Sequence, residues 1–203
     1  MNKFQKFLVK IASLFYPCKV YGKNNIPKGS AVLACNHYSA IDCLYFLELQ
    51  QDDLSFLAKK ELFKNKLFGK VLKVYGAIPI DRENPEMRSL MAAIKVLKDG
   101  KKLTIFPEGT RNKSGSKELQ ELKGGTAVFA VKAKCPIVPV MIYKKARFFV
   151  KNKMIIGKPF TLDEYYSKTL DEQTVAEMDK ILAEKMIEQQ YLLRKLVKSK
   201  TKK

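Results

Sequence analysis

Short apolar runs recur along the chain, and turn-forming residues bound most of them. Such runs are typical of β-strands. Two of them, Leu103–Phe106 and Ile137–Ile142, are almost continuously apolar instead of alternating with polar residues, which indicates central strands covered on both faces. The pattern predicts strands at Ala31–Cys35, Leu54–Leu57, Ala77–Ile80, Leu103–Phe106, Ile137–Ile142, Arg147–Val150 and Met154–Ile156.

Between several of these runs lie longer segments with apolar residues three or four positions apart, the spacing of an amphipathic helix. They predict helices at Ser39–Leu49, Pro85–Lys98, Gly124–Lys134 and Gln173–Lys198. Strands that alternate with helices predict a single α/β domain, in which helices flank a mixed, largely parallel sheet. A chain of 203 residues is long enough to bury one such core.

The N-terminal segment, residues 1–17, has a helical pattern of its own. Its apolar residues recur at three- and four-residue spacing with lysines between them, and Lys10 interrupts any signal-peptide core. No run of about 18 apolar residues predicts a spanning helix. We interpret residues 1–17 as an amphipathic helix on a membrane surface; a helix packed on the protein's own core is the alternative. The apolar positions are Phe4, Phe7, Leu8, Ile11, Leu14 and Phe15.

Charge narrows the choice of partner. The chain has 39 Lys and Arg against 20 Asp and Glu, a formal net charge of +19, which implies a polyanionic partner. An anionic membrane leaflet, an acidic carrier with an anionic substrate, and nucleic acid all fit this charge. We expect no nucleic acid, because the chain lacks an RNA-binding aromatic signature and zinc-ligand spacing. Residues 198–203 form a basic tail.

The four cysteines indicate reduced intracellular thiols without structural zinc.

The only histidine, His37, directly follows the strand expected at Ala31–Cys35 and precedes Asp42 by five residues. On a continuous helix this spacing separates two side chains by about 140°, so the pair can meet only across a turn. If Ser39 is the helix N-cap, Asp42 falls at N3 and points back toward His37. The carboxylate would then orient the imidazole and leave its other nitrogen free to accept a proton. A capping box beside a structural histidine is the alternative interpretation.

A second polar segment, Phe106–Arg111, follows another expected strand and contains a carboxylate, a glycine and a cation in Glu108, Gly109 and Arg111. Loops at strand ends are where α/β folds place their sites. A third segment, Gly76–Arg82, also ends a strand with a cation. Taken singly, each is equally compatible with a polar surface turn.

Together these segments resemble the ordered motifs of the glycerolipid acyltransferase family, which includes 1-acylglycerol-3-phosphate acyltransferases. The resemblance covers about residues 20–159 and identifies residues 18–197 as an acyltransferase domain. Two departures, Asn112 in place of a serine and Leu122 in place of an aromatic residue, are not expected to touch the chemistry. The matching segments are Asn36-His37-x4-Asp42, Gly76–Arg82, Phe106–Arg111, Lys123-Gly124-Gly125 and Val138-Pro139-Val140.

This resemblance implies transfer of a fatty acyl group from acyl-CoA or acyl carrier protein to the sn-2 hydroxyl of 1-acylglycerol-3-phosphate, giving phosphatidate. It implies no cofactor and no metal, and a peripheral or monotopic enzyme at the cytoplasmic face of the cell membrane. The implied site residues are His37 as base, Asp42 to orient it, N–H groups around Gly109 for the oxyanion, Glu108 for the acceptor, and Arg82, Arg111 and Lys123 for its phosphate.

Three alternatives stay open at this point. The acceptor can be another lysophospholipid or glycerol 3-phosphate instead of lysophosphatidate. Cys35, two residues before His37, can form an acyl-enzyme, because a Cys–His pair at a strand end is chemically reasonable. In a different functional class, the protein can bind a membrane or nucleic acid without catalysis.

Overall fold

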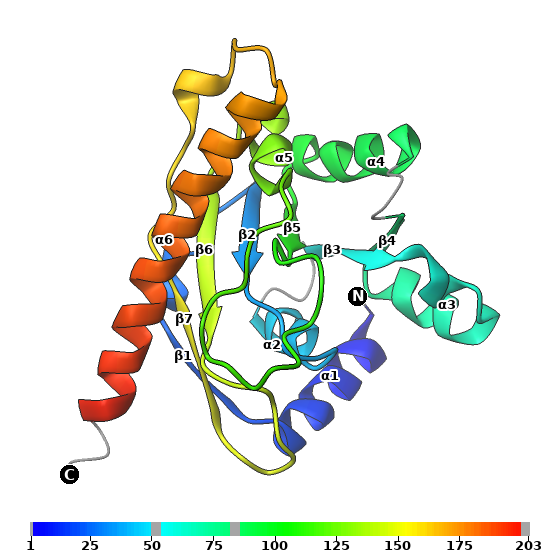
Figure 1. The fold of residues 1–203 in the computed structure, drawn as a ribbon. Coiled ribbons are helices and arrows are strands. Elements are labelled where there is room, and N and C mark those ends of the chain that lie inside the picture. The colour runs from blue at the N-terminus through cyan, green and yellow to red at the C-terminus, as the bar shows by residue number, and fades with distance from the viewer. Residues whose placement is uncertain (1, 50–53, 82–85, 200–203) are drawn as a thin grey trace.

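The computed structural model describes residues 2–49, 54–81 and 86–199, and one seven-stranded sheet forms its centre (Figure 1). The strand order is β1-β7-β6-β2-β5-β3-β4. The five strands from β6 to β4 are parallel, β7 is antiparallel to β6, and β1 is parallel to β7. The strands are β1 Cys18–Tyr21, β2 Ala31–Cys35, β3 Leu54–Lys59, β4 Ala77–Ile80, β5 Lys102–Ile105, β6 Ile137–Ile142 and β7 Asn152–Ile156.

Helices cover both faces of the sheet, so successive side chains of the central strand β2 enter two different cores. Val32 and Ala34 pack in the core beneath α4, α5 and α6, whereas Leu33 and Cys35 pack in the core beneath α1 and α2. All five β2 residues are buried. The helices are α1 Lys3–Phe15, α2 Asp42–Leu49, α3 Lys66–Val74, α4 Met87–Lys98, α5 Thr126–Ala133 and α6 Glu172–Ser199.

The predicted α/β sheet is confirmed, with one strand wrong and two elements unforeseen. Residues Arg147–Val150 form a tight turn closed by a bridge between their two ends, and not a strand. Phe149 in this turn has φ 57°, a conformation that an extended strand does not contain. The strand β1 and the helix α3 were not predicted. Lys198 and Ser199 end α6, and the rest of the basic tail lies outside the described residues.

Helix α1 exposes its apolar side to solvent. Val9 and Ser13 on one side are buried against the protein, whereas Phe4 and Phe7 on the opposite side are 66% and 58% exposed. Asn2 caps the helix through a reciprocal pair of hydrogen bonds with Gln5. No helix in the described part of the chain combines the length and the apolar character needed to cross a membrane.

Candidate active site

The predicted motifs converge where two neighbouring parallel strands end. Residues 36–42 follow β2, residues 106–111 follow β5, and these strands are adjacent in the sheet. The carboxyl ends of parallel strands are where α/β sheets place their sites, since the loops there meet at one edge. Residues 71 positions apart in sequence thereby come into contact: the His37 N–H donates a hydrogen bond to Glu108.

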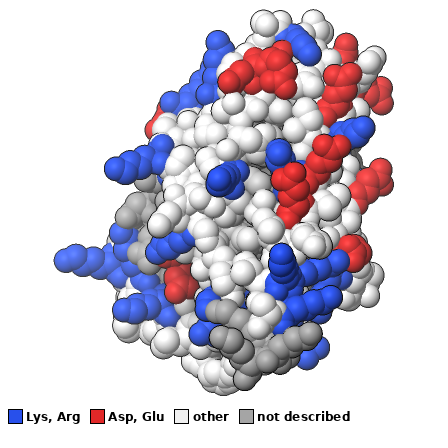
Figure 2. Space-filling view, turned by 90° about the vertical axis from the view of Figure 1, so that its left-hand side faces the viewer, with Lys and Arg blue, Asp and Glu red and all other residues white. Residues whose placement is uncertain are grey.

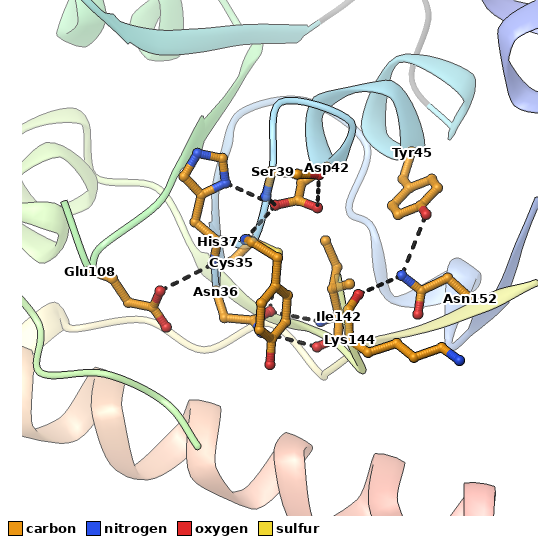
Figure 3. Close-up of polar contacts among 11 residues, drawn as sticks. Cys35, Asn36, His37, Ser39, Asp42, Tyr45, Glu108, Ile142, Lys144 and Asn152 are labelled. Atoms are coloured by element: carbon orange, nitrogen blue, oxygen red, sulfur yellow. Dashed lines mark hydrogen bonds and ion pairs between the residues drawn. The ribbon is translucent and has the colours of Figure 1, made fainter. Parts of the chain in front are cut away.

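The predicted contact between His37 and Asp42 is present (Figure 3). The His37 Nδ1 lies 2.9 Å from the Asp42 Oδ2, and both side chains are buried. Within the described residues the other ring nitrogen, Nε2, has no hydrogen-bond partner and points away from Asp42 in Figure 3. A carboxylate at Nδ1 favours the tautomer that leaves Nε2 unprotonated, which is the state of a general base.

Backbone groups hold the Asp42 carboxylate in place. Its Oδ2 accepts the N–H groups of Tyr38 at 2.6 Å and Ser39 at 2.7 Å, in addition to the histidine. Helix α2 begins at Asp42 and not at Ser39, so Asp42 contacts His37 without Ser39 being the helix N-cap. The turn is closed by the Asp42 N–H, which donates to the Ser39 carbonyl. The acid thus caps its own turn and contacts the imidazole with the same oxygen.

The loop that carries His37 is attached at three points to residues 106–112, which follow β5 and which we call the β5 loop. The His37 N–H donates to Glu108 Oε2 at 3.2 Å, and the His37 carbonyl accepts the Asn112 N–H at 2.7 Å. The imidazole also stacks on the Phe106 ring, with centroids 3.9 Å apart. With its backbone clamped on both sides and one ring face covered, His37 retains little freedom to rotate.

Glu108 is a clamp between loops. It is 1% exposed, and each carboxylate oxygen accepts a backbone N–H, one from His37 and one from Gln120 at 3.3 Å. Burial raises the pKa of Glu108 above its ordinary value, although the two N–H donors act against that rise. These contacts give Glu108 a positioning role that its sequence motif does not reveal.

Gly109 does not offer its own N–H to a substrate, because that group donates to the Phe106 carbonyl at 3.0 Å. The prediction that N–H groups around Gly109 stabilise an oxyanion therefore leaves the neighbouring N–H groups as candidates, and not that of Gly109 itself. Gly109 serves another purpose, since it has φ +64° and a Cβ placed on it would lie 2.9 Å from Lys123 Cγ. A glycine is needed here for both the left-handed turn and the close approach of Lys123.

Of the three predicted phosphate ligands, Lys123 and Arg111 lie within the described residues and Arg82 does not. The Lys123 N–H donates to the Pro107 carbonyl at 2.8 Å, so Lys123 lies against the β5 loop with an exposed side chain. Arg111 is also exposed, and its charge acts on Cys43 in α2. Burial raises the pKa of the Cys43 thiol to about 12, and the positive charge of Arg111 opposes this rise. A groove of about 990 Å³ between residues 118–124 and α6 is lined by Lys123 but not by His37.

The rival nucleophile Cys35 is not positioned for catalysis. It is fully buried in β2, on the face that packs beneath α1 and α2. Burial raises the pKa of its thiol well above the usual range, with the charge of Asp42 acting in the same direction. A thiol that is buried and protonated is a poor nucleophile.

Two asparagines organise the site in ways that the sequence did not indicate. The Asn36 side chain makes a reciprocal pair of hydrogen bonds with the Ile142 backbone, at 3.0 Å and 2.7 Å, and so joins the ends of β2 and β6. Asn112 is not expected from the sequence to touch the chemistry directly, yet its N–H donates to the His37 carbonyl and its side chain orders residues 114–118. The available signal was the place of Asn36 within its motif and the position of Asn112 directly after another motif.

Comparisons with known proteins agree with these motifs. A family model described as Acyltransferase matches residues 17–143. The 1-acyl-sn-glycerol-3-phosphate acyltransferase of Bacillus subtilis is 39% identical over 171 residues, which are 78% of this chain and 82% of that protein. The enzyme of the same name from Borreliella burgdorferi is 38% identical over 138 residues, 66% of this chain and 54% of that protein.

A solved structure shares the fold. The crystal structure of the 1-acyl-sn-glycerophosphate acyltransferase from Thermotoga maritima superimposes with a TM-score of 0.67 at 26% identity, covering 92% of this chain and 78% of the other. The resemblance that the motifs predicted is confirmed by the family match and by these relatives. The chain belongs to the acyltransferase family.

Proposed function

We propose that the protein transfers a fatty acyl group from a thioester to the sn-2 hydroxyl of 1-acyl-sn-glycerol-3-phosphate and so produces phosphatidate. The observation that carries this proposal is the buried pair of His37 and Asp42 at the end of β2. The chain that holds this pair is 39% identical to a 1-acyl-sn-glycerol-3-phosphate acyltransferase. The acyl donor is a substrate, and the reaction proposed here needs no cofactor.

The chemistry follows from the geometry of the pair. The acceptor hydroxyl attacks the thioester carbonyl carbon while its proton passes to Nε2 of His37, a form of base catalysis that contributes about 10²–10⁴-fold. Asp42 stabilises the resulting imidazolium. The tetrahedral intermediate then expels the thiolate, which takes the proton from His37 and leaves as a free thiol. Atoms and charge balance without a covalent enzyme intermediate.

We assign the acceptor's phosphate to the cations around the β5 loop. Arg111 and Lys123 are exposed, and Lys123 lies directly over Gly109 in the loop that contacts His37. Arginine binds phosphate through paired hydrogen bonds, and lysine contributes a compact charge. Arg82 stays a predicted third ligand from its motif. The oxyanion needs a donor other than the Gly109 N–H, because that group is already bonded to Phe106.

We further propose that the enzyme works at the cytoplasmic face of the cell membrane, with α1 on the lipid surface. Five large apolar side chains of α1 are exposed, which fits an interfacial helix better than one packed on the core: Phe4, Phe7, Leu8, Leu14 and Phe15. Deletion of residues 1–16 should weaken co-sedimentation with anionic vesicles. We expect no nucleic-acid partner, and absence of a gel shift at physiological salt would support this expectation.

The experiment that tests the function supplies labelled palmitoyl thioesters of coenzyme A and of acyl carrier protein to the purified protein. Lysophosphatidate, lysophosphatidylcholine and glycerol 3-phosphate are compared as acceptors. We expect labelled phosphatidate from lysophosphatidate. Product from another acceptor alone would reassign the substrate, and no product from any combination would refute acyl transfer.

A further inference from the structure

The connection between β6 and β7 is a hairpin with two adjacent aromatic residues exposed at its tip. Phe148 is 55% exposed and Phe149 is 67% exposed, and Val150 beside them is also exposed. Phe149 has φ 57°, a left-handed conformation that bulky side chains rarely adopt. Strained backbone of this kind concentrates at functional sites. Neither the sheet nor the loop of residues 36–42, which we call the catalytic loop, requires two phenylalanines in water at this position.

The tip is joined to the C-terminal end of α1. The Phe15 ring stacks on Phe148 with centroids 5.1 Å apart and tilts against Phe149 at 5.5 Å, while Tyr16 meets the edge of Phe148. The Phe149 N–H donates to the Phe15 carbonyl at 2.8 Å. These four residues, Phe15, Tyr16, Phe148 and Phe149, form one cluster, which we call the aromatic tip. It continues the exposed apolar side of α1.

Basic residues flank Phe148 and Phe149 in the sequence. Residues 144–153 contain five basic residues and no acidic residue. An apolar tip between cations matches an anionic lipid interface, because the rings enter the acyl boundary while lysines stay at the level of the phosphates. Charge is also segregated on the face in Figure 2, where basic side chains gather toward the lower end and along one margin and most acidic ones lie at the top and along the other margin.

The base of the hairpin is attached to the catalytic loop (Figure 3). The buried Asn152 donates to the Lys144 carbonyl at 2.7 Å and to the Tyr45 hydroxyl at 3.4 Å, which ties the two strands of the hairpin to α2. Ile142, where β6 ends, is bonded to the side chain of Asn36, the neighbour of His37. The orientation of the aromatic tip is therefore fixed relative to the catalytic loop.

From these contacts we propose that the aromatic tip is a second membrane-contact element, which extends the exposed apolar side of α1. It inserts Phe148 and Phe149 between the headgroups of an anionic bilayer and holds the catalytic loop at a fixed orientation to the interface where the acceptor resides. The inference rests on the proposed membrane-surface location and extends it by assigning a role to the β6–β7 hairpin.

The chain contains no tryptophan, so one introduced residue is a unique fluorescent probe of insertion. Phe149→Trp is compared with Tyr191→Trp on α6, because Tyr191 is equally exposed at 67%. We expect vesicles of phosphatidylglycerol and phosphatidylcholine to shift the Phe149→Trp emission to the blue, and brominated lipids to quench it. Tyr191→Trp should show neither effect. Unchanged Phe149→Trp emission in vesicles that sediment the protein would overturn the proposal.

A loss-of-function pair complements the probe. Phe148→Ser/Phe149→Ser should weaken vesicle partitioning roughly tenfold or more, because two rings no longer leave water. The control Tyr191→Ser/Leu192→Ser removes an adjacent exposed apolar pair from α6 and should partition like the wild type. Equal partitioning of wild type and tip variant would overturn the proposal. So would a wild-type dimer that the tip variant abolishes, because the tip would then bind a second copy.

Activity separates this inference from the proposed function. The tip variant should acylate a dispersed short-chain lysophosphatidate at the wild-type rate and lose rate only with vesicle-embedded acceptor. A variant equally slow with both acceptors would show that the tip supports the fold of the site, and would overturn the membrane role. If wild type acylates neither acceptor, the proposed function fails while the fluorescence measurement still decides on insertion.

Discussion

The catalytic loop, residues 36–42, and the aromatic tip depart from the usual distribution of side chains in opposite directions. The loop buries its polar side chains, including His37 at 7% exposure and Asp42 at 0%, whereas the tip exposes large aromatic rings. The carboxylate oxygens that orient the loop accept hydrogen bonds from within the protein, whereas the ring contacts of Phe148 and Phe149 among the described residues are with each other, Phe15 and Tyr16. Buried polar groups are tolerated where they are fully hydrogen-bonded, but exposed aromatic surface indicates an external partner.

The difference assigns two tasks to two regions. The catalytic loop holds the base in position, and the aromatic tip brings the protein to the membrane. Fixing the imidazole before the substrate arrives reduces the reorganisation needed in the transition state. A rigid loop cannot also reach into a bilayer, so a neighbouring hairpin makes the contact with lipid. Substitutions in the loop should therefore change turnover, and substitutions at the tip should change partitioning to the membrane.

The largest expected effect is a loss of turnover on substitution of Asp42 in the catalytic loop. Asp42→Asn leaves the shape of the side chain but removes the charge that stabilises the imidazolium and places an amide against Nδ1. Turnover should fall by about 10²–10⁴-fold with little change in acceptor KM. Initial rates with saturating thioester measure this effect. A folded variant with more than a tenth of wild-type turnover would contradict the assigned role.

The next effect concerns the clamp between the loops. Glu108→Ala leaves the N–H groups of the buried His37 and the half-buried Gln120 without acceptors, which costs up to about 1–3 kcal/mol for each group. Thermal unfolding should show a lower midpoint, and turnover should fall because the base is less well held. Glu108→Gln keeps one acceptor oxygen and should lie between alanine and wild type. Wild-type stability in the alanine variant would refute the clamp.

The clamp should also depend on pH. Burial raises the folded-state pKa of Glu108 above its usual value near 4.5, so the protonated form is favoured on folding. Its contribution to stability is complete below the unfolded pKa and diminishes as pH rises through the folded pKa. The stability difference between wild type and Glu108→Gln should therefore be more favourable to wild type at pH 4 than at pH 7. The opposite trend in urea titrations would contradict the burial argument.

A smaller effect is expected where Lys123 crosses the β5 loop. Gly109→Ala and Gly100→Ala both place a side chain at positive φ, costing about 1–2 kcal/mol, but a Cβ at Gly100 meets nothing within 4 Å. Only Gly109→Ala displaces Lys123, so only this variant should raise the acceptor KM. Gly109→Ala should lose at least as much stability as Gly100→Ala, because it also displaces Lys123. An equal change in KM for both would remove Lys123 from the acceptor site.

The smallest effect is expected from single charges beside the aromatic tip. Lys145→Gln and Lys151→Gln should each weaken binding to anionic vesicles roughly fivefold at low salt, and less at high salt. Lys98→Gln and Lys101→Gln, at the exposed end of α4 and the turn before β5, serve as matched controls. Equal losses in both pairs would indicate that net charge alone, and not the tip, governs binding.

Local pattern predicted most of the sheet and the central contact of the site. The runs at Ala31–Cys35 and Ile137–Ile142 became strands because both faces of each are buried, and His37 met Asp42 because only a turn separates them. The turn at residues 147–150 was misread as a strand because aromatic and basic residues also suit an exposed edge. The pattern does not reveal that Phe149 adopts a left-handed conformation.

Long-range contacts account for what the sequence did not predict. Glu108 accepts N–H groups from two separate loops, and Asn36 pairs with Ile142, 106 positions away. No periodicity encodes such partners, since they depend on which strands lie side by side. The use of the Gly109 N–H within its own turn likewise depends on the path of the folded loop. The motifs therefore identified which residues lie at the site. They did not indicate which of these residues take part in catalysis and which position the others.

The most direct test of the account compares His37→Ala with Cys35→Ala in acyl transfer from palmitoyl thioester to lysophosphatidate. Direct transfer with histidine as the base predicts a loss of about 10²–10⁴-fold for His37→Ala and near-normal turnover for Cys35→Ala, with both proteins folded. Near-normal turnover in His37→Ala, or a folded but inactive Cys35→Ala, would contradict the proposed mechanism.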